Sequence, residues 1–274
     1  NPIDLANEFE TPLYVYDSEK MTEQYDNMKN AFKSTNVKLN YACKALTNIS
    51  ILKLFKELGS GLDAVSIQEV WLAKQAGFKA KDILFTPNGV SLEEIELVIK
   101  EDVNITIDNL SILEQFGIKY GDSYPICVRL NPHIMAGGNS KISVGHIDSK
   151  FGISIYQLPH VHRIVATNNI KINGVHMHTG SDILDVDAFL RGTDILLNAA
   201  KEFDSLDFID FGSGFKVKYK AEDFGTDINE LGQKLSKKFN SFCKSYGRNL
   251  QLVFEPGKYL VSEAGEFLAK VNVV

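Results

Sequence analysis

The sequence has few cysteines and no long apolar segment. Its three cysteines, Cys43, Cys127 and Cys243, are odd in number and far apart, which excludes a disulfide framework and a closely spaced zinc motif. No run of about eighteen apolar residues occurs, so no membrane span and no membrane association are expected. The first residues also lack the basic and then apolar pattern of a secretory leader. We therefore expect a cytoplasmic protein.

An excess of positive charge is also missing. The 29 Lys and Arg residues are outnumbered by 35 Asp and Glu residues, which leaves a net charge of −6. A surface for nucleic acids is therefore not expected. The chain has 274 residues, of which 44% are hydrophobic and 23% charged, as in ordinary globular proteins. This length is enough for a large core and is close to the usual size of one βα barrel.

Predicted strands and helices alternate along most of the chain. Apolar and β-branched runs indicate eight strands, and a helical pattern follows each of the first seven. Ser91 and Glu94 form a capping box at one helix start. Strict alternation favours an α/β fold of the (β/α)8 TIM-barrel type over a doubly wound sheet. The predicted strands lie near residues 38–45, 61–66, 83–87, 104–108, 125–131, 171–179, 206–212 and 251–255.

Both chain ends carry patterns that fall outside the barrel. Residues 11–17 and 266–274 read as strands, and an amphipathic helix is predicted between about Ser18 and Phe32. We expect the start of a second, incomplete β-rich domain to which both ends contribute. The expected division is residues 35–257 for the barrel, and residues 1–34 and 258–274 for the second domain and its connection. Within the barrel, the long connection 132–150 has no helical period and is expected to act as a binding loop or lid.

Polar signals stand where six of the predicted strands end. A (β/α)8 barrel builds its active site from the C-terminal ends of its strands, so six signals at one end indicate a single composite site. The signals are YACKA at Lys44, GLDAVS at Asp63, RLNP at Arg129, HMHTGS at His178 to Ser181, DFGSGF at Gly212 to Gly214 and FEPGK at Glu255 to Lys258.

A lysine and two histidines are the first candidates for chemistry. Lys44 is expected to point to the barrel mouth with its stem in apolar surroundings, where a neutral amine can attack an aldehyde; alone, it also fits an exposed strand-end lysine. Asp63 is either its partner or a helix cap. His176 and His178 share one face of a strand. We expect His178 to pack on a flat ring and His176 to be hydrogen-bonded deeper down, and no metal is expected because no third ligand follows with suitable spacing.

Glycine, serine and a carboxylate complete the candidate set. Ser181 and the run from Gly212 to Gly214 offer backbone N–H and hydroxyl donors for a phosphate, although tight turns explain the glycines equally well. Glu255 is suited to keep a pyridine nitrogen protonated, or else to form a structural ion pair. A lysine, a ring-stacking imidazole, a phosphate cradle and a pyridinium partner are the parts needed to hold pyridoxal 5'-phosphate.

In combination and in this order, these motifs resemble those of the alanine-racemase-like, or fold type III, pyridoxal-phosphate enzymes, and within them the diaminopimelate decarboxylases. The resemblance extends from TPLYVYD onward and is strongest at YACKA, GLDAVS, GHIDSKFGIS, HMHTGSDI, DFGSGF and FEPGKYLVSEAG. It implies that Lys44 binds the cofactor aldehyde, that His178 stacks on the ring and that Glu255 pairs with the ring nitrogen. The implied cofactor-binding residues are Lys44, Asp63, His178, Ser181, Gly212, Ser213, Gly214, Glu255, Pro256, Gly257 and Lys258, with Lys258 also binding substrate.

The resemblance further implies decarboxylation of meso-diaminopimelate to L-lysine, the last step of lysine biosynthesis, in a homodimer with a shared active site. Two residues depart from the family pattern. Ser213 stands within the usual triple glycine, and Lys258 replaces an arginine, so the planar two-point grip on an anion is lost. Three alternatives stay open: another fold type III amino-acid decarboxylase, a racemase, and a barrel that binds the cofactor without turnover.

Overall fold

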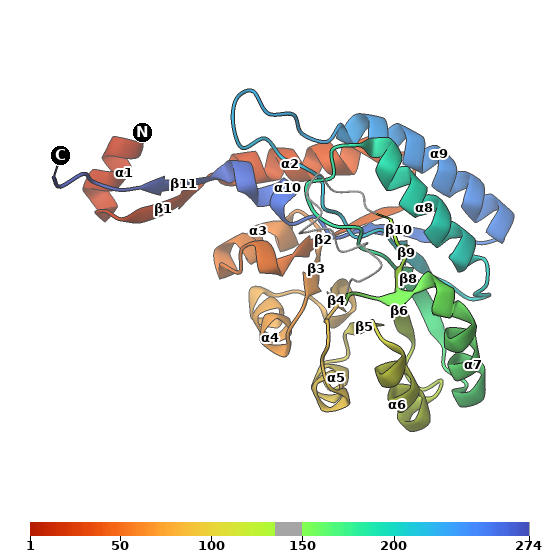
Figure 1. Ribbon diagram of the computed structural model, residues 1–274. Helices are drawn as coiled ribbons and strands as arrows, with labels where there is room; N and C mark the ends of the chain where they lie inside the picture. The colour runs from red at the N-terminus through yellow and green to blue at the C-terminus, as the bar shows by residue number, and fades with distance from the viewer. Residues whose placement is uncertain (135–149, 274) are drawn as a thin grey trace.

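Eight parallel strands close into a barrel at the centre of the protein (Figure 1). The computed structural model describes residues 1–134 and 150–273. Each barrel strand pairs in parallel with the next, and β10 pairs back with β2, so the predicted (β/α)8 barrel is confirmed. The barrel strands are β2 (Val37–Ala42), β3 (Gly61–Ala64), β4 (Ile83–Phe85), β5 (Asn104–Ile107), β6 (Ile126–Asn131), β8 (Ile172–His176), β9 (Phe208–Asp210) and β10 (Gln251–Phe254). A two-residue strand, β7 (Ile153–Ser154), pairs with β6 on the same sheet.

Helices surround the barrel, and side-chain caps mark where most of them begin. The predicted capping residue Ser91 accepts a hydrogen bond from the backbone N–H of Glu94 at 3.3 Å. The helix predicted to reach Phe203 ends at Ala200. The helices between strands are α3 (Ile49–Glu57), α4 (Ile67–Ala76), α5 (Leu92–Ile99), α6 (Leu110–Tyr120), α7 (Leu158–Asn168), α8 (Val186–Ala200) and α9 (Ile228–Tyr246), with 3-10 turns at η1 (Cys43–Ala45), η2 (Ala80–Asp82) and η4 (Ile155–Gln157).

Helix α2 (Ser18–Ala31) packs on the outside of the barrel against α9. Met21, Tyr25 and Met28 lie on one face of it and are buried, as their spacing of three and four residues predicts for an amphipathic helix. Phe32, the C-cap residue directly after the helix, places its ring 4.8 Å from the ring of Phe254 on β10. The packing of these side chains therefore attaches α2 to the barrel.

A short ribbon projects away from the barrel beside the N-terminal helix α1 (Pro2–Phe9) (Figure 1). It consists of β1 (Leu13–Tyr16) paired antiparallel with β11 (Gly265–Leu268), which follows α10 (Lys258–Val261) and η5 (Ser262–Ala264). The strand predicted over 266–274 is therefore too long. Only four residues of β1 are available to pair with it, and residues 269–273 have no regular structure.

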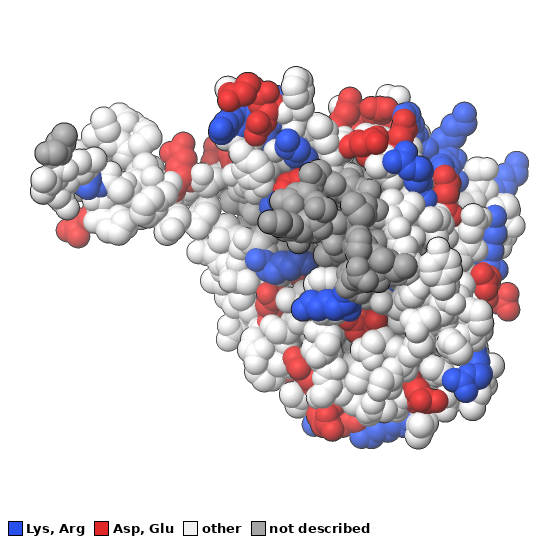
Figure 2. Space-filling model, in the orientation of Figure 1, with Lys and Arg blue, Asp and Glu red and all other residues white. Residues whose placement is uncertain are grey.

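The surface carries mixed charge in the view of Figure 2. Acidic and basic side chains are interspersed over the barrel, and the projecting ribbon is mostly uncharged. Tyr14 and Phe267 are exposed on this ribbon, with ring centroids 4.8 Å apart. Among the described helices, none combines the length and the apolar character needed to cross a membrane.

We predict that Phe254→Ala destabilises the barrel strongly. Phe254 is fully buried, and its ring lies within 6.5 Å of four other phenylalanine rings from α2, α8 and the segment around β9. Deleting it should leave a cavity and lower the free energy of unfolding by about 3 to 5 kcal/mol. Phe224→Ala is the matched control, because Phe224 is 75% exposed. Urea denaturation measures both, and similar losses would contradict the packing described.

Candidate active site

Two adjoining cavities open at the C-terminal ends of the barrel strands. Their volumes are about 230 Å³ and 430 Å³. Lys44, His178 and Glu255 line both of them, so these three residues form the shared wall. The smaller cavity is also lined by Ala42, Ala45, Ser181, Ser213, Gly214, Phe215, Gly257, Lys258 and Tyr259. The larger one is also lined by Val65, Thr86, Asn88, Arg129, Lys150, Phe151 and His176.

Backbone hydrogen bonds between neighbouring strand ends hold this region together. The N–H of Glu255 donates to the carbonyl of Gly212 at 2.8 Å, and the N–H of Ala42 donates to the carbonyl of Pro256 at 3.1 Å. The Ser213 hydroxyl donates to the Glu255 carbonyl at 2.8 Å. The segments after β9, β10 and β2 are thereby fixed to one another, which sets the positions of their side chains.

Lys44 lies in the 3-10 turn η1, directly after β2, and reaches toward β3. Its Nζ is 3.7 Å from Oδ2 of Asp63. Its side chain is 54% exposed, so the expected apolar surroundings are only partly present. Asp63 does not cap the following helix, because that role belongs to Ser66, which accepts from the N–H of Glu69. Of the two interpretations, Asp63 is therefore the partner of Lys44.

Asp63 is buried within β3 and has an altered pKa. Burial and the nearby charge of Glu255 raise its pKa from 3.8 to about 6, although Lys44 and a hydrogen bond from the Thr86 hydroxyl act in the opposite direction. The Lys44 amine thus faces a carboxylate that gains a proton just below neutral pH.

The turn after β9 forms one wall of the smaller cavity. Gly212 and Gly214 have φ angles of 61° and 97°, a left-handed conformation that favours glycine. A Cβ on Gly214 would collide with the carbonyl oxygen of Gly180, so this approach also requires glycine. Ser213 between them is buried, and Ser181 faces the same cavity. The glycines therefore form the tight left-handed turn, and Gly214 lines the smaller cavity, whereas their binding of a phosphate stays a prediction.

His178 lies between the two cavities and is uncharged. Its Nδ1 accepts a hydrogen bond from the N–H of Ser213 at 3.4 Å. Burial, together with the positive charges of Lys44 and Arg129, holds its pKa well below the usual value. A neutral imidazole in this position can pack against a flat ligand.

Glu255 follows β10 and is 5% exposed. Its Oε2 is 3.0 Å from Nε2 of His176, which is also buried, as expected for the deeper histidine. Burial raises the pKa of Glu255, and the charges of Lys44 and Arg129 oppose this rise. Its Oε1 has no hydrogen-bonding partner among the described residues. The carboxylate therefore has an acceptor site to offer to a ligand.

Lys258 forms an ion pair and a hydrogen bond with residues of neighbouring loops. Its Nζ is 2.7 Å from Oδ1 of Asp182 and 3.1 Å from the Tyr219 hydroxyl. Asp182 adopts a φ of 56°, which is uncommon for a residue other than glycine. Lys258 also lines the smaller cavity with Ser181. It can therefore bind an anion there, but with part of its charge already balanced by Asp182.

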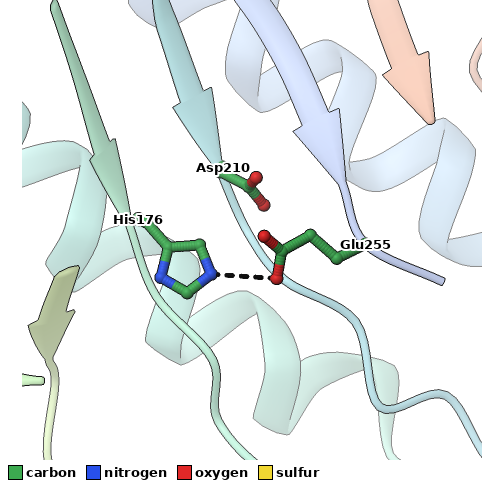
Figure 3. A group of neighbouring side chains, drawn as sticks. All are labelled: His176, Asp210 and Glu255. Atoms are coloured by element: carbon green, nitrogen blue, oxygen red, sulfur yellow. Dashed lines mark hydrogen bonds and ion pairs between the residues drawn. The ribbon is translucent and has the colours of Figure 1, made fainter. Parts of the chain in front are cut away.

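Sequence reasoning assigned no role to Asp210 and Arg129. Asp210 ends β9 inside the DFGSGF motif and is fully buried near His176 and Glu255 (Figure 3). Arg129 begins the RLNP signal on β6, is 7% exposed and places its Cζ 4.9 Å from the centre of the Phe151 ring. Both are charged residues inside apolar strands, and that pattern in the sequence could have indicated that they belong to the site.

The expected loop or lid at 132–150 lies mostly outside the described residues.

Comparison with known proteins identifies the family. Residues 18–262 match the pyridoxal-binding domain of the pyridoxal-dependent decarboxylases. The chain belongs to this family. Diaminopimelate decarboxylase of Methanothermobacter thermautotrophicus is 33% identical over 280 residues, which cover 99% of this chain and 65% of that protein. The enzyme of Campylobacter jejuni is 32% identical over 277 residues, covering 97% of this chain and 67% of the relative.

Solved structures of the family have the same fold. Diaminopimelate decarboxylase from Helicobacter pylori, complexed with L-lysine, superimposes with a TM-score of 0.88 at 30% identity, covering 97% of this chain and 68% of that one. The chain thus spans about 65% of the length of the M. thermautotrophicus relative. Membership in this pyridoxal-dependent family assigns pyridoxal phosphate as the cofactor of the barrel.

We predict that Gly214→Ala damages both the fold and the site. The added methyl group would meet the Gly180 carbonyl in a left-handed conformation, and we expect a loss of about 2 to 4 kcal/mol in unfolding free energy together with weaker pyridoxal-phosphate binding. Gly89→Ala is the control, because Gly89 has a φ of 66° but no atoms within 4 Å of the added Cβ. It should cost about 1 kcal/mol and leave binding unchanged. Equal losses in stability and binding would show that the close approach at Gly214 is unimportant.

Proposed function

We propose that this protein decarboxylates meso-diaminopimelate to L-lysine, the last step of lysine biosynthesis, with pyridoxal phosphate bound at the barrel mouth. The observation that carries the proposal is the wall of Lys44, His178 and Glu255 shared by the two cavities. The relatives support the substrate, because diaminopimelate decarboxylases of three organisms match 97% to 99% of this chain at 31% to 33% identity.

The side chains of the site fit this cofactor. The smaller cavity has donors for a phosphate in Ser181, Ser213 and the backbone around Gly214, with Lys258 at its edge. The larger cavity holds Arg129, His176 and Thr86 around a space of about 430 Å³, which suits a polar amino acid. We infer that the phosphate lies in the first cavity and the substrate in the second.

Each residue of the shared wall then has a distinct task. The Lys44 amine would hold the cofactor through its aldehyde group. Pyridoxal phosphate supplies an electron sink for the bond that breaks at Cα. Glu255 would balance the charge of a protonated ring nitrogen, and His178 would cover the ring as an uncharged imidazole. Asp63 holds Lys44 in position through the 3.7 Å contact.

We propose residues 35–257 as the barrel domain, with residues 1–34 and 258–274 as parts of a second β-rich domain and its connection, where α2 is the connecting helix that packs on the barrel. We also propose a homodimer with a shared active site and a cytoplasmic location. Pro256 and Gly257 are assigned to the cofactor site through their position after Glu255, where Gly257 lines the smaller cavity.

A product assay tests the reaction. The full-length protein, loaded with pyridoxal phosphate, receives meso-diaminopimelate, ornithine, lysine and arginine in parallel, and carbon dioxide and amine products are measured. We expect turnover with meso-diaminopimelate and release of L-lysine. Preference for another of these amino acids would replace the substrate assignment, and conversion to a stereoisomer without carbon dioxide would indicate a racemase. If the protein binds pyridoxal phosphate but converts none of the four amino acids, the alternative of a cofactor-binding barrel without turnover would be supported.

We predict that Lys44 is the residue that binds the cofactor covalently. Borohydride reduction of the loaded protein followed by peptide mapping should label Lys44 alone, and Lys44→Ala should abolish the absorbance of the bound aldehyde. Lys258→Ala is the control. It removes a lysine from the same cavity, so it should weaken binding while leaving the label on Lys44. A label on any other lysine contradicts the assignment.

A further inference from the structure

Three ionisable side chains meet inside the barrel, one from each of three neighbouring strands. His176 ends β8, Asp210 ends β9 and Glu255 follows β10 (Figure 3). Their exposed fractions are 1%, 0% and 5%. One ring nitrogen of His176 and one carboxylate oxygen from each acid all lie within 4.8 Å of one another. Because these side chains are shielded from water, each charge must be balanced by a close partner or neutralised by gain or loss of a proton.

The hydrogen bonds of this group leave two oxygens unmatched. Oε2 of Glu255 is bonded to His176 at 3.0 Å, and Oδ1 of Asp210 accepts from the N–H of Gly212 at 2.8 Å. Oδ2 of Asp210 and Oε1 of Glu255 have no hydrogen-bonding partner among the described residues. The two carboxyl groups point toward each other in Figure 3. Two facing carboxylates that were both ionised would repel strongly at this depth.

The surrounding charges decide which of the two acids keeps a proton. Burial and the charge of Glu255 raise the pKa of Asp210 well above its usual value. The pKa of Glu255 also rises with burial, but Lys44 and Arg129 oppose that rise and favour the ionised form. Burial and the charge of Arg129 hold the pKa of His176 well below its usual value. The titratable and charged groups around His176, Asp210 and Glu255 are Lys44, Asp63, Asp108, Cys127, Arg129 and His178.

We propose that Asp210 carries a proton in the folded protein and shares it with Glu255, so that Asp210 and His176 act as positioning residues for an ionised Glu255. Asp210 donates its O–H toward Oε1, and neutral His176 donates Nε2–H to Oε2. A carboxylate has about four acceptor sites, so Glu255 keeps capacity for a ring N–H. The consequence for the cofactor rests on the proposed function, whereas the shared proton does not.

Infrared spectroscopy of the cofactor-free protein tests the proton directly. At about pH 8, well above the ordinary aspartate pKa, we expect a C=O band of a protonated acid that shifts when aspartate is 13C-labelled. The band should be absent from Asp210→Asn and present in Asp63→Asn, because Asp63 has a pKa of about 6 and is already ionised there. Loss of the band in Asp63→Asn, or no such band at all, overturns the proposal.

Stability against pH provides a second readout. A raised pKa in the folded state means that the folded chain keeps a proton that the unfolded chain has released above about pH 4. The contribution of Asp210 to the free energy of unfolding should therefore fall as pH rises above that value. Asp210→Asn should change the slope of the unfolding free energy against pH by the equivalent of about one bound proton, in the direction of a smaller fall. An unchanged slope in Asp210→Asn overturns the proposal.

The conservative variant separates positioning from a merely structural role. An asparagine amide can donate to Glu255 and accept from Gly212, as a protonated acid does, whereas alanine does neither. With pyridoxal phosphate bound, Asp210→Asn should therefore lose less turnover than Asp210→Ala. Equal losses would mean that Asp210 acts through its charge.

A cation between the two acids is the competing explanation. In that case, adding Zn²⁺, Mn²⁺ or Mg²⁺ to chelator-treated protein would raise the Tm of the original chain but not the Tm of Asp210→Asn. That result would overturn the proposal of a shared proton. We expect no such difference. All readouts except turnover use protein without cofactor. A failed product assay beside a positive infrared result would therefore reject the proposed function alone.

Discussion

Closure of the parallel barrel is the constraint on which the site depends. Every barrel strand runs in the same direction, so all the strand ends that carry polar residues meet at one mouth. The backbone hydrogen bond from Ala42 to Pro256 joins the first strand end to the last, and the bond from Glu255 to Gly212 joins the last to its neighbour. Lys44 and Glu255 are more than 200 residues apart in sequence, yet they line the same two cavities because the ring closes there.

The charges gathered at this mouth are costly to bury, and their arrangement limits that cost. Asp63 and Glu255 are acids in dry surroundings, and the positive charges of Lys44 and Arg129 favour the ionised forms of both. Lys44 remains half-exposed, so its amine can reach a ligand while its charge still acts on the acids. The site therefore combines a fixed buried layer of acids with a more accessible layer of groups that can contact a cofactor and substrate.

Much of the fold could be predicted because strand periodicity and strand-end polarity are local signals. The eight strands and the position of Lys44 at the end of the first predicted one follow from such signals, although the strand itself ends at Ala42 and Lys44 lies in the turn that follows. Contacts across the barrel are different, because they depend on which strands become neighbours and on their register. The approach of Asp210 to Glu255, and the pairing of Lys258 with Asp182, are of this kind. Strand length at the chain ends was overestimated for the same reason, since the pairing partner limits β11.

The central claim is that these strand ends form one pyridoxal-phosphate site. The most direct measurement is a crystal structure of the protein after borohydride reduction with bound pyridoxal phosphate. We expect a covalent bond to Nζ of Lys44, the ring nitrogen facing Glu255, and the phosphate among Ser181, Ser213 and Gly214. A cofactor bound elsewhere on the barrel, or a ring nitrogen turned away from Glu255, would contradict the account.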